Sequence, residues 1–228
     1  AMAITGTPET APLRAGWPVA DTVGGLTAAL AIAAALNDPE PGAVIDVSMR
    51  DALMATMGWA VSNYLATGVD AVPAGNENLT AAPSATYAAA DGPINVAANK
   101  QEQWERLARH LGLDELLDDP RFRTRADRKV HRVDLRAALE AKLKERRAEE
   151  WEVELNAIGV PSGRVLKLPE ALDQARAAGQ IAEFELKDGR RIEAFRTGMR
   201  IDGAPLTVDA APPELGEDTE TILSDLGL

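Results

Sequence analysis

The stretch RAGWPVADTVGGLTAALAIAAAL, residues 14–36, decides how the rest of the chain is organised. It places one carboxylate, Asp21, between a short apolar run and a pair of glycines, Gly24 and Gly25, that open a long alanine-rich helix. We therefore expect Asp21 to cap the start of this helix, where it accepts hydrogen bonds from free backbone N–H groups and faces the positive end of the helix dipole. A charged carboxylate in that place is either a simple helix cap or a nucleophile.

The neighbours of Asp21 suit an approaching molecule. Gly24 and Gly25 remove side chains within one turn of the carboxylate, so a carbonyl group of another molecule can come close to the backbone. Backbone N–H groups near these glycines are candidates for stabilising an oxyanion. Three apolar residues would help to exclude water: Trp17, Val19 and Val23.

The first part of the chain predicts alternating helix and strand. Residues 22–36 are apolar on all sides, which predicts a buried helix that ends at the turn 37–42. Residues 43–49 are rich in β-branched side chains and predict a strand, and residues 50–66 return to helical spacing. This order indicates a parallel α/β layer. We interpret Asp46 and Asp51 as a solvent-facing residue and a helix cap rather than as an acid–base pair.

The remainder predicts smaller elements. Residues 67–83 form a connector rich in Gly, Pro and Asn. Residues 84–98 predict a hairpin around Asp91-Gly92, and further helices are expected over 102–111, 133–143, 149–158, 168–178 and 219–226, with a second hairpin over 181–186 and 191–195. The expected domains are 1–70, part of a large α/β domain with Asp21; 71–83, a linker; 84–160, a small α+β domain; and 161–228, a linker and a return to the large domain.

Composition excludes several functions. The net charge is −12, from 36 acidic and 24 basic residues, so neither nucleic acid nor an anionic membrane is an expected partner. Cysteine is absent, which excludes thiol chemistry, and neither His110 nor His131 has a partner at metal-ligand spacing, so no metal is assigned. No apolar run is long enough to span a membrane. The expected location is the cytoplasm.

Six motifs follow one another along the chain. The first is the run Gly16, Pro18, Asp21 and Gly25, and the second is the passage 43–52, AVIDVSMRDA. The others are Asp91-Gly92, the segment 118–122, the segment 159–163 and the ending 215–219. In this order the six motifs resemble family III CoA transferases of the CaiB/BaiF and formyl-CoA transferase type. Mild departures occur at Ser162, Arg164 and Asp218, where relatives often carry Cys, Pro and His.

The resemblance implies a fold and a chemistry. The fold would be α/β, part of a Rossmann-like large domain with a smaller α+β domain, in an interlocked homodimer. Asp21 would attack an acyl-CoA thioester, and CoA would pass to a carboxylic acid through anhydride intermediates. Acyl-CoA is then a substrate, with no permanently bound cofactor. Gly75 and Asn76 resemble a loop that in some members closes over the active site, although a simple turn explains this pair as well.

Two alternatives stay open. In the related α-methylacyl-CoA racemases the aligned Asp works as an acid–base group beside a His from a Gly-His-Asp segment earlier in the chain. The sequence also begins at a point that lies well inside the chain of relatives, so we expect that an N-terminal portion is missing, either cropped or encoded separately. The present chain would then be a non-catalytic fragment or assembly module on its own.

Overall fold

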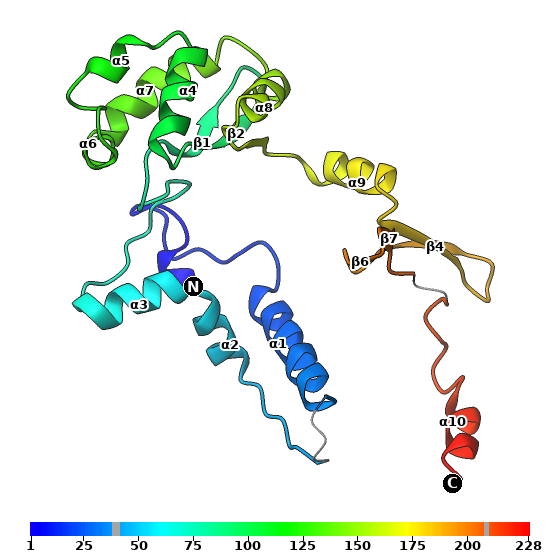
Figure 1. The fold of residues 1–228 in the computed structure, drawn as a ribbon. Coiled ribbons are helices and arrows are strands. Elements are labelled where there is room, and N and C mark those ends of the chain that lie inside the picture. The colour runs from blue at the N-terminus through cyan, green and yellow to red at the C-terminus, as the bar shows by residue number, and fades with distance from the viewer. Residues whose placement is uncertain (38–41, 208–209) are drawn as a thin grey trace. The chain divides into compact units, whose positions relative to one another are not determined.

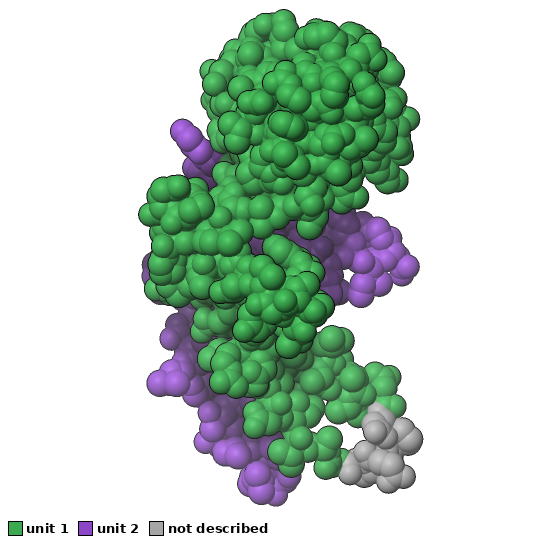
Figure 2. Space-filling model, turned by 90° about the vertical axis from the view of Figure 1, so that its left-hand side faces the viewer, with its two compact units in different colours: residues 1–165 green, residues 166–228 purple. Residues whose placement is uncertain are grey.

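A computed structural model of the chain describes residues 1–37, 42–207 and 210–228 (Figure 1). The chain divides into two compact units, residues 1–165 and residues 166–228, which are coloured separately in Figure 2. Helices and small antiparallel sheets make up both units, which confirms the α/β class. No helix of the described residues is long and apolar enough to cross a membrane.

The first half of unit 1 is helical. Its elements are η1 (Met2–Ile4), α1 (Val19–Ala35), α2 (Met49–Thr56) and α3 (Gly58–Thr67). The single helix expected over 50–66 is therefore two, with Met57 between them. Ser48, not Asp51, caps α2, because the Ser48 hydroxyl accepts a hydrogen bond from the Asp51 N–H.

Two predictions for this half are wrong. The helix α1 was expected to be buried, yet Leu26 and Leu30 are 67% and 71% exposed, and Gly24 is the one buried residue of α1. Burial needs a covering neighbour, and α2 is the element that lies beside α1 in unit 1. Residues 42–48 form no strand either, since a strand needs a paired partner. The turn expected over 37–42 falls mostly outside the described residues.

The second half of unit 1 holds a closed core. Strands β1 (Ser84–Ala88), β2 (Pro93–Ala97) and β3 (Ser162–Arg164) form one antiparallel sheet in that order. Five helices follow β2 before the chain returns as β3: α4 (Gln101–His110), α5 (Glu115–Asp118), α6 (Arg125–Val130), α7 (Arg132–Leu143) and α8 (Ala148–Ala157). The predicted hairpin and the helices matching α4, α7 and α8 are confirmed; β3, α5 and α6 were not predicted.

The sheet buries one face and leaves the other open. Alternation along β2 buries Ile94 and Val96 and exposes Asn95. The buried face meets fully buried side chains from the helices, including Trp104, Leu107, Leu135, Leu139 and Leu155. Each such aliphatic side chain contributes about 1.5–3 kcal/mol through its removal from water. The open face is free to line a site.

Unit 2 contains little buried surface. Its elements are α9 (Leu168–Ala177), β4 (Ile181–Glu185), β5 (Arg191–Phe195), β6 (Arg200–Ile201), β7 (Ala204–Pro205) and α10 (Thr219–Asp225). The β4–β5 hairpin, α9 and α10 confirm the sequence predictions, whereas the short β6–β7 pair was not predicted. Arg176 of α9 is joined to Glu193 of β5 by an ion pair at 2.9 Å.

Candidate functional site

Asp21 lies in the first turn of α1, in the third helical position. Pro18 occupies the cap position and no side chain caps this end, so the expected capping role of Asp21 is wrong. The reason is that the helix starts two residues before Asp21, at Val19, directly after the fixed backbone of Pro18. The carboxylate still lies near the positive end of the helix dipole.

The Asp21 carboxylate and two backbone N–H groups beside it have no hydrogen-bond partner among the described residues. The carboxylate has neither a hydrogen bond nor an ion pair among the described residues, and it is exposed. Val19 donates its N–H to Trp17 O at 2.8 Å, and Thr22 donates to Pro18 O at 3.0 Å. The N–H groups of Ala20 and Asp21 have no acceptor within the described part of the chain. One negative group and two free donors therefore occur together at this helix end.

A cavity of about 230 Å³ opens beside Asp21. Its apolar walls include Trp17, Leu13, Val19 and, from α2, Leu53. Arg14 also lines this cavity. Trp17 and Val19 thus lie where the sequence placed them, whereas Val23 is not part of the lining.

Gly24 and Gly25 lie inside α1 rather than in a loop. A Cβ on Gly24 would be 2.8 Å from Met49 Cγ, whereas a Cβ on Gly25 would meet nothing within 4 Å. Gly24 therefore allows α1 and α2 to approach each other. The role of these glycines in stabilising an oxyanion stays a prediction, and the free donors nearest the carboxylate belong to Ala20 and Asp21 instead.

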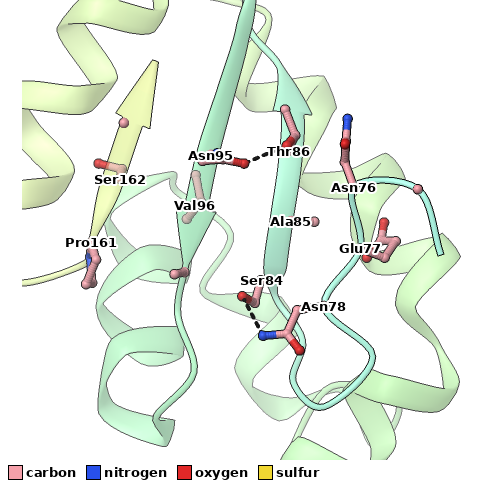
Figure 3. Close-up of a pocket in the computed structure, with 13 residues that line it drawn as sticks. Asn76, Glu77, Asn78, Ser84, Ala85, Thr86, Asn95, Val96, Pro161 and Ser162 are labelled. Atoms are coloured by element: carbon pink, nitrogen blue, oxygen red, sulfur yellow. Dashed lines mark hydrogen bonds between the residues drawn. The ribbon is translucent and has the colours of Figure 1, made fainter. Parts of the chain in front are cut away.

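Gly75 and Asn76 line a second, larger depression on the open face of the sheet (Figure 3). Its volume is about 640 Å³. Thr86 of β1 donates a hydrogen bond to the Asn95 side chain of β2 at 2.5 Å, and the Asn78 amide donates to the Ser84 hydroxyl at 3.3 Å. The lining combines small polar side chains with one carboxylate, Glu77, so it offers both hydrogen-bond donors and acceptors.

One segment connects the two cavities. Gly75 has a left-handed backbone, with φ of 58°, and donates its N–H to Gly6 O at 2.6 Å. A Cβ at this position would be 3.1 Å from the Thr7 side chain. Met2 and Thr5, in the same N-terminal segment, line the cavity beside Asp21. The structure thus places Gly75 and Asp21 against neighbouring parts of residues 1–7, without direct contact between them.

Sequence reasoning missed a group of arginines on α6 and α7: Arg125, Arg128, Arg132 and Arg136. Arginine recurs every three or four residues in RADRKVHRVDLR, which places Arg125 with Arg128 on one side of α6 and Arg132 with Arg136 on one side of α7. Arg128 is fully buried and donates from Nε to Ala82 O at 2.9 Å and from Nη1 to Phe122 O at 2.9 Å. Burial lowers the pKa of Arg128 to about 10, so the guanidinium is still charged at neutral pH.

His110 belongs to a small cluster of charged side chains. His110 lies 2.9 Å from Glu154, which also forms an ion pair with Arg146 at 2.6 Å. Hydrogen bonds from Arg146 and His110 lower the pKa of Glu154 to about 2. No group of three potential metal ligands occurs among the residues that the structure describes.

Comparison with known proteins adds a family model and full-length relatives. The model of CoA-transferase family III matches residues 1–219. A succinate–glutarate CoA-transferase of Agrobacterium fabrum is 30% identical over 99% of the chain, and a succinyl-CoA–D-citramalate CoA-transferase of Chloroflexus aurantiacus is 31% identical over 98%. The crystal structure of a CAIB/BAIF family protein from Brucella suis superimposes with a TM-score of 0.77 at 30% identity, over 99% of the chain. The chain spans 58%, 57% and 60% of these three proteins.

Proposed function

Because the chain belongs to CoA-transferase family III, we propose that the complete protein transfers CoA from an acyl-CoA thioester to a carboxylic acid, with Asp21 as the nucleophile. The observation that carries the proposal is the unpaired carboxylate in the first turn of α1, at the edge of a largely apolar cavity. The assignment of this role to Asp21 also rests on the resemblance of the motif around it.

The proposed reaction is balanced without an external acid or base. An Asp21 oxygen attacks the thioester carbonyl carbon, the C–S bond breaks, and CoA leaves as a thiolate, which gives a mixed anhydride. The thiolate then attacks the aspartyl carbonyl and releases the donor acid, which leaves an aspartyl-CoA thioester. The acceptor carboxylate repeats these two steps in reverse. Asp21 is regenerated, and one acyl-CoA has replaced another.

The surroundings of Asp21 support each requirement of this chemistry. A carbonyl oxygen that becomes negative needs hydrogen-bond donors, and the N–H groups of Ala20 and Asp21 are free next to the carboxylate. An anhydride must be protected from water, and Trp17, Leu13 and Leu53 provide apolar walls.

The first substrates to test follow from the relatives. The two curated relatives are named for succinate, glutarate and D-citramalate, all acids with two carboxylates. We propose a dicarboxylic acid as the acceptor class. The homodimer implied by the resemblance and the expected cytoplasmic location are likewise part of the proposal, and light scattering of the complete protein measures its oligomeric state.

The deciding experiment compares Asp21→Asn with Asp51→Asn in the complete protein. Asp51 is a matched control, since it occupies the third position of α2 as Asp21 does in α1. With succinyl-CoA and glutarate, we expect D21N to lose on the order of a thousandfold in turnover and D51N to keep nearly all of it. Hydroxylamine added with acyl-CoA should modify residue 21 of the wild type, as shown by peptide mass spectrometry.

Three results would contradict this function. Wild-type turnover by D21N would remove Asp21 from the chemistry. Exchange of the α-proton of a branched acyl-CoA without CoA transfer would indicate the racemase alternative. Failure of the complete protein to transfer CoA to any dicarboxylate would refute the proposed acceptor class.

A further inference from the structure

Four arginines on α6 and α7 face the connector that leads from α3 to β1. We name Arg125, Arg128, Arg132 and Arg136 the arginine row, and residues 77–82 of the connector the held segment. The held segment has no helix and pairs with β1 only through a single bridge between Glu77 and Ala85. Backbone groups in such a segment need other partners.

Three members of the arginine row supply these partners. Arg132 donates to Asn78 O at 3.3 Å, Arg125 donates to Thr80 O at 2.9 Å, and Arg128 donates to Ala82 O at 2.9 Å. The acceptors are the carbonyls of every second residue, in a segment that turns at residues 79–80 and bends at Ala82. Three cations therefore fix the course of the held segment at three successive points.

The fourth arginine fixes the beginning of the held segment. Arg136 donates from Nε to Glu77 Oε1 at 2.8 Å, and its Nη2 forms a second, shorter contact with the same oxygen. It also donates to Thr86 O at 2.9 Å, in strand β1. Although burial alone would lower the pKa of Arg136, its hydrogen bonds to Glu77 and Glu140 raise it on balance.

Charged donors make this attachment stronger than neutral ones would. A hydrogen bond from a guanidinium to a carbonyl is shorter and stronger than one between two neutral groups. Arg128 is the extreme case, because its guanidinium is fully buried and has no carboxylate partner in the described part of the chain. It contacts backbone carbonyls and lies 5.3 Å from the centroid of the Trp104 ring. A buried cation is retained only where its partners compensate for lost water.

The held segment borders the depression of Figure 3. Asn76, Glu77 and Asn78 form one side of that depression, next to β1. Asn76 O accepts from the Thr86 N–H at 3.2 Å, and Gly75 N–H reaches Gly6 O at 2.6 Å. A shift of the held segment would therefore move Gly75 and Asn76, and with them the attachment to residues 1–7, which also border the cavity of Asp21.

We propose that the arginine row is a positioning device: it holds residues 77–82 so that Gly75 and Asn76 keep the substrate-binding wall of the transferase in place. This proposal rests on the proposed function. The arginines contact the backbone or the Glu77 side chain of the held segment and do not line the Asp21 cavity, so they are positioning residues. Their loss should weaken substrate binding rather than abolish the chemistry.

The test uses Arg125→Gln and Arg132→Gln in the complete protein. Arg125 is exposed and Arg132 half-buried, so both variants avoid Arg128, whose replacement would leave buried carbonyls without a donor. The matched control is Arg109→Gln, which removes an exposed arginine of α4 whose ion pair with Glu105 spans 3.6 Å. Each protein is measured by peptide-resolved hydrogen exchange, by melting temperature and by steady-state kinetics with succinyl-CoA and glutarate.

In R125Q and R132Q we expect faster amide hydrogen exchange in residues 75–82 together with a higher KM. We expect amide exchange in residues 75–82 to become about tenfold faster in R125Q and R132Q, with no change in α4 or α7, because each variant removes a charge-assisted hydrogen bond. The KM of at least one substrate should rise about tenfold, with kcat within about twofold. A smaller folded fraction would lower kcat and leave KM unchanged, so the KM rise separates positioning from stability. Arg132→Lys, which keeps one charged donor, should recover part of the loss.

Two results would overturn the proposal: unchanged exchange in residues 75–82, or faster exchange with both KM values at the wild-type level. The outcome is distinct from a failure of the proposed function. If the wild-type protein transferred no CoA, the role in substrate binding would fall with it, whereas the exchange measurement would still decide whether the arginine row holds this segment.

Discussion

Both halves of unit 1 contain helices with many apolar side chains, but these side chains are buried in one half and largely exposed in the other. Residues 82–160 enclose their own core, in which Leu139 and Leu155 are fully buried. Residues 19–67 also form regular helices, yet Leu26, Leu30 and Leu65 are each more than 60% exposed. Periodicity and capping are local, so they produce helices in both halves. Burial depends on neighbours, and the neighbours are present in only one half. Asp21 belongs to the half that does not enclose itself.

The largest effect should come from the core of residues 82–160. Leu139→Ala removes a fully buried side chain of α7, and we expect it to lower the free energy of unfolding by about 2–5 kcal/mol. Leu30→Ala is the matched change on α1, where the side chain is 71% exposed, and should cost less than about 0.5 kcal/mol in this chain. Urea unfolding of both variants measures the difference.

Equal losses in the two variants would contradict the comparison, because they would show that Leu30 is covered as well as Leu139 is. If L30A lowered the free energy of unfolding of the complete protein but not of this chain, the contrast between the two halves would be a property of this chain alone. That result would show that the covering surface of α1 lies outside the residues described here.

Much of the self-enclosed half could be predicted from sequence. Asp91-Gly92 indicated the turn between β1 and β2, and the spacing of Trp104, Leu107 and Ala108 indicated the buried face of α4. These signals are local, and the partners they need are supplied by nearby segments. β3 was missed because three residues carry no periodicity, and its pairing with β2 depends on a contact far along the chain.

The candidate site was predictable only in part. The position of Asp21 at the beginning of a helix follows from Pro18 and the apolar run after it. The sequence does not predict that Asp21 occupies the third helical position, because the start of a helix shifts easily by two residues. The strand over 43–49 and the burial of α1 were wrong for one reason: both needed a partner that the sequence pattern assumed. The arginine row was missed because three of its members bond to backbone carbonyls, which carry no sequence signature. The carboxylate partner of Arg136 is Glu77, which lies 59 residues away in the sequence.

A second prediction compares the two glycines of α1. Gly25→Ala adds a methyl group in open space and should stabilise the chain by about 0.5–1 kcal/mol through helix propensity. Gly24→Ala gains the same propensity but places its Cβ 2.8 Å from Met49 Cγ, and such overpacking costs about 1–3 kcal/mol. We expect G24A to be less stable than G25A by about 1–2 kcal/mol, which thermal and urea unfolding can resolve.

The outcome shows how firmly α1 and α2 are joined. If G24A and G25A were equally stable, Met49 would have moved aside without cost, and the packing of α1 against α2 at Gly24 would be loose. Met49→Ala in the G24A background is the control. It removes the clashing atoms and should restore most of the difference.

The smallest expected effect concerns acid stability and returns to the self-enclosed half. Hydrogen bonds from Arg146 and His110 lower the pKa of Glu154 to about 2, below its ordinary value of 4.5. A carboxyl with a depressed folded-state pKa stabilises the fold fully above its unfolded pKa, and this contribution is lost as the pH falls from 4.5 to 2. Glu154→Gln should therefore flatten the fall in stability over that range, by a modest amount because the pair is partly solvent-screened.

Urea unfolding from pH 7 to pH 2.5 measures this change in the free energy of unfolding. The control is the exposed Glu102→Gln, since Glu102 forms no ion pair among the described residues. If both variants followed the wild-type curve, the ion pairs of Glu154 would contribute nothing to the acid stability of the half that encloses its own core.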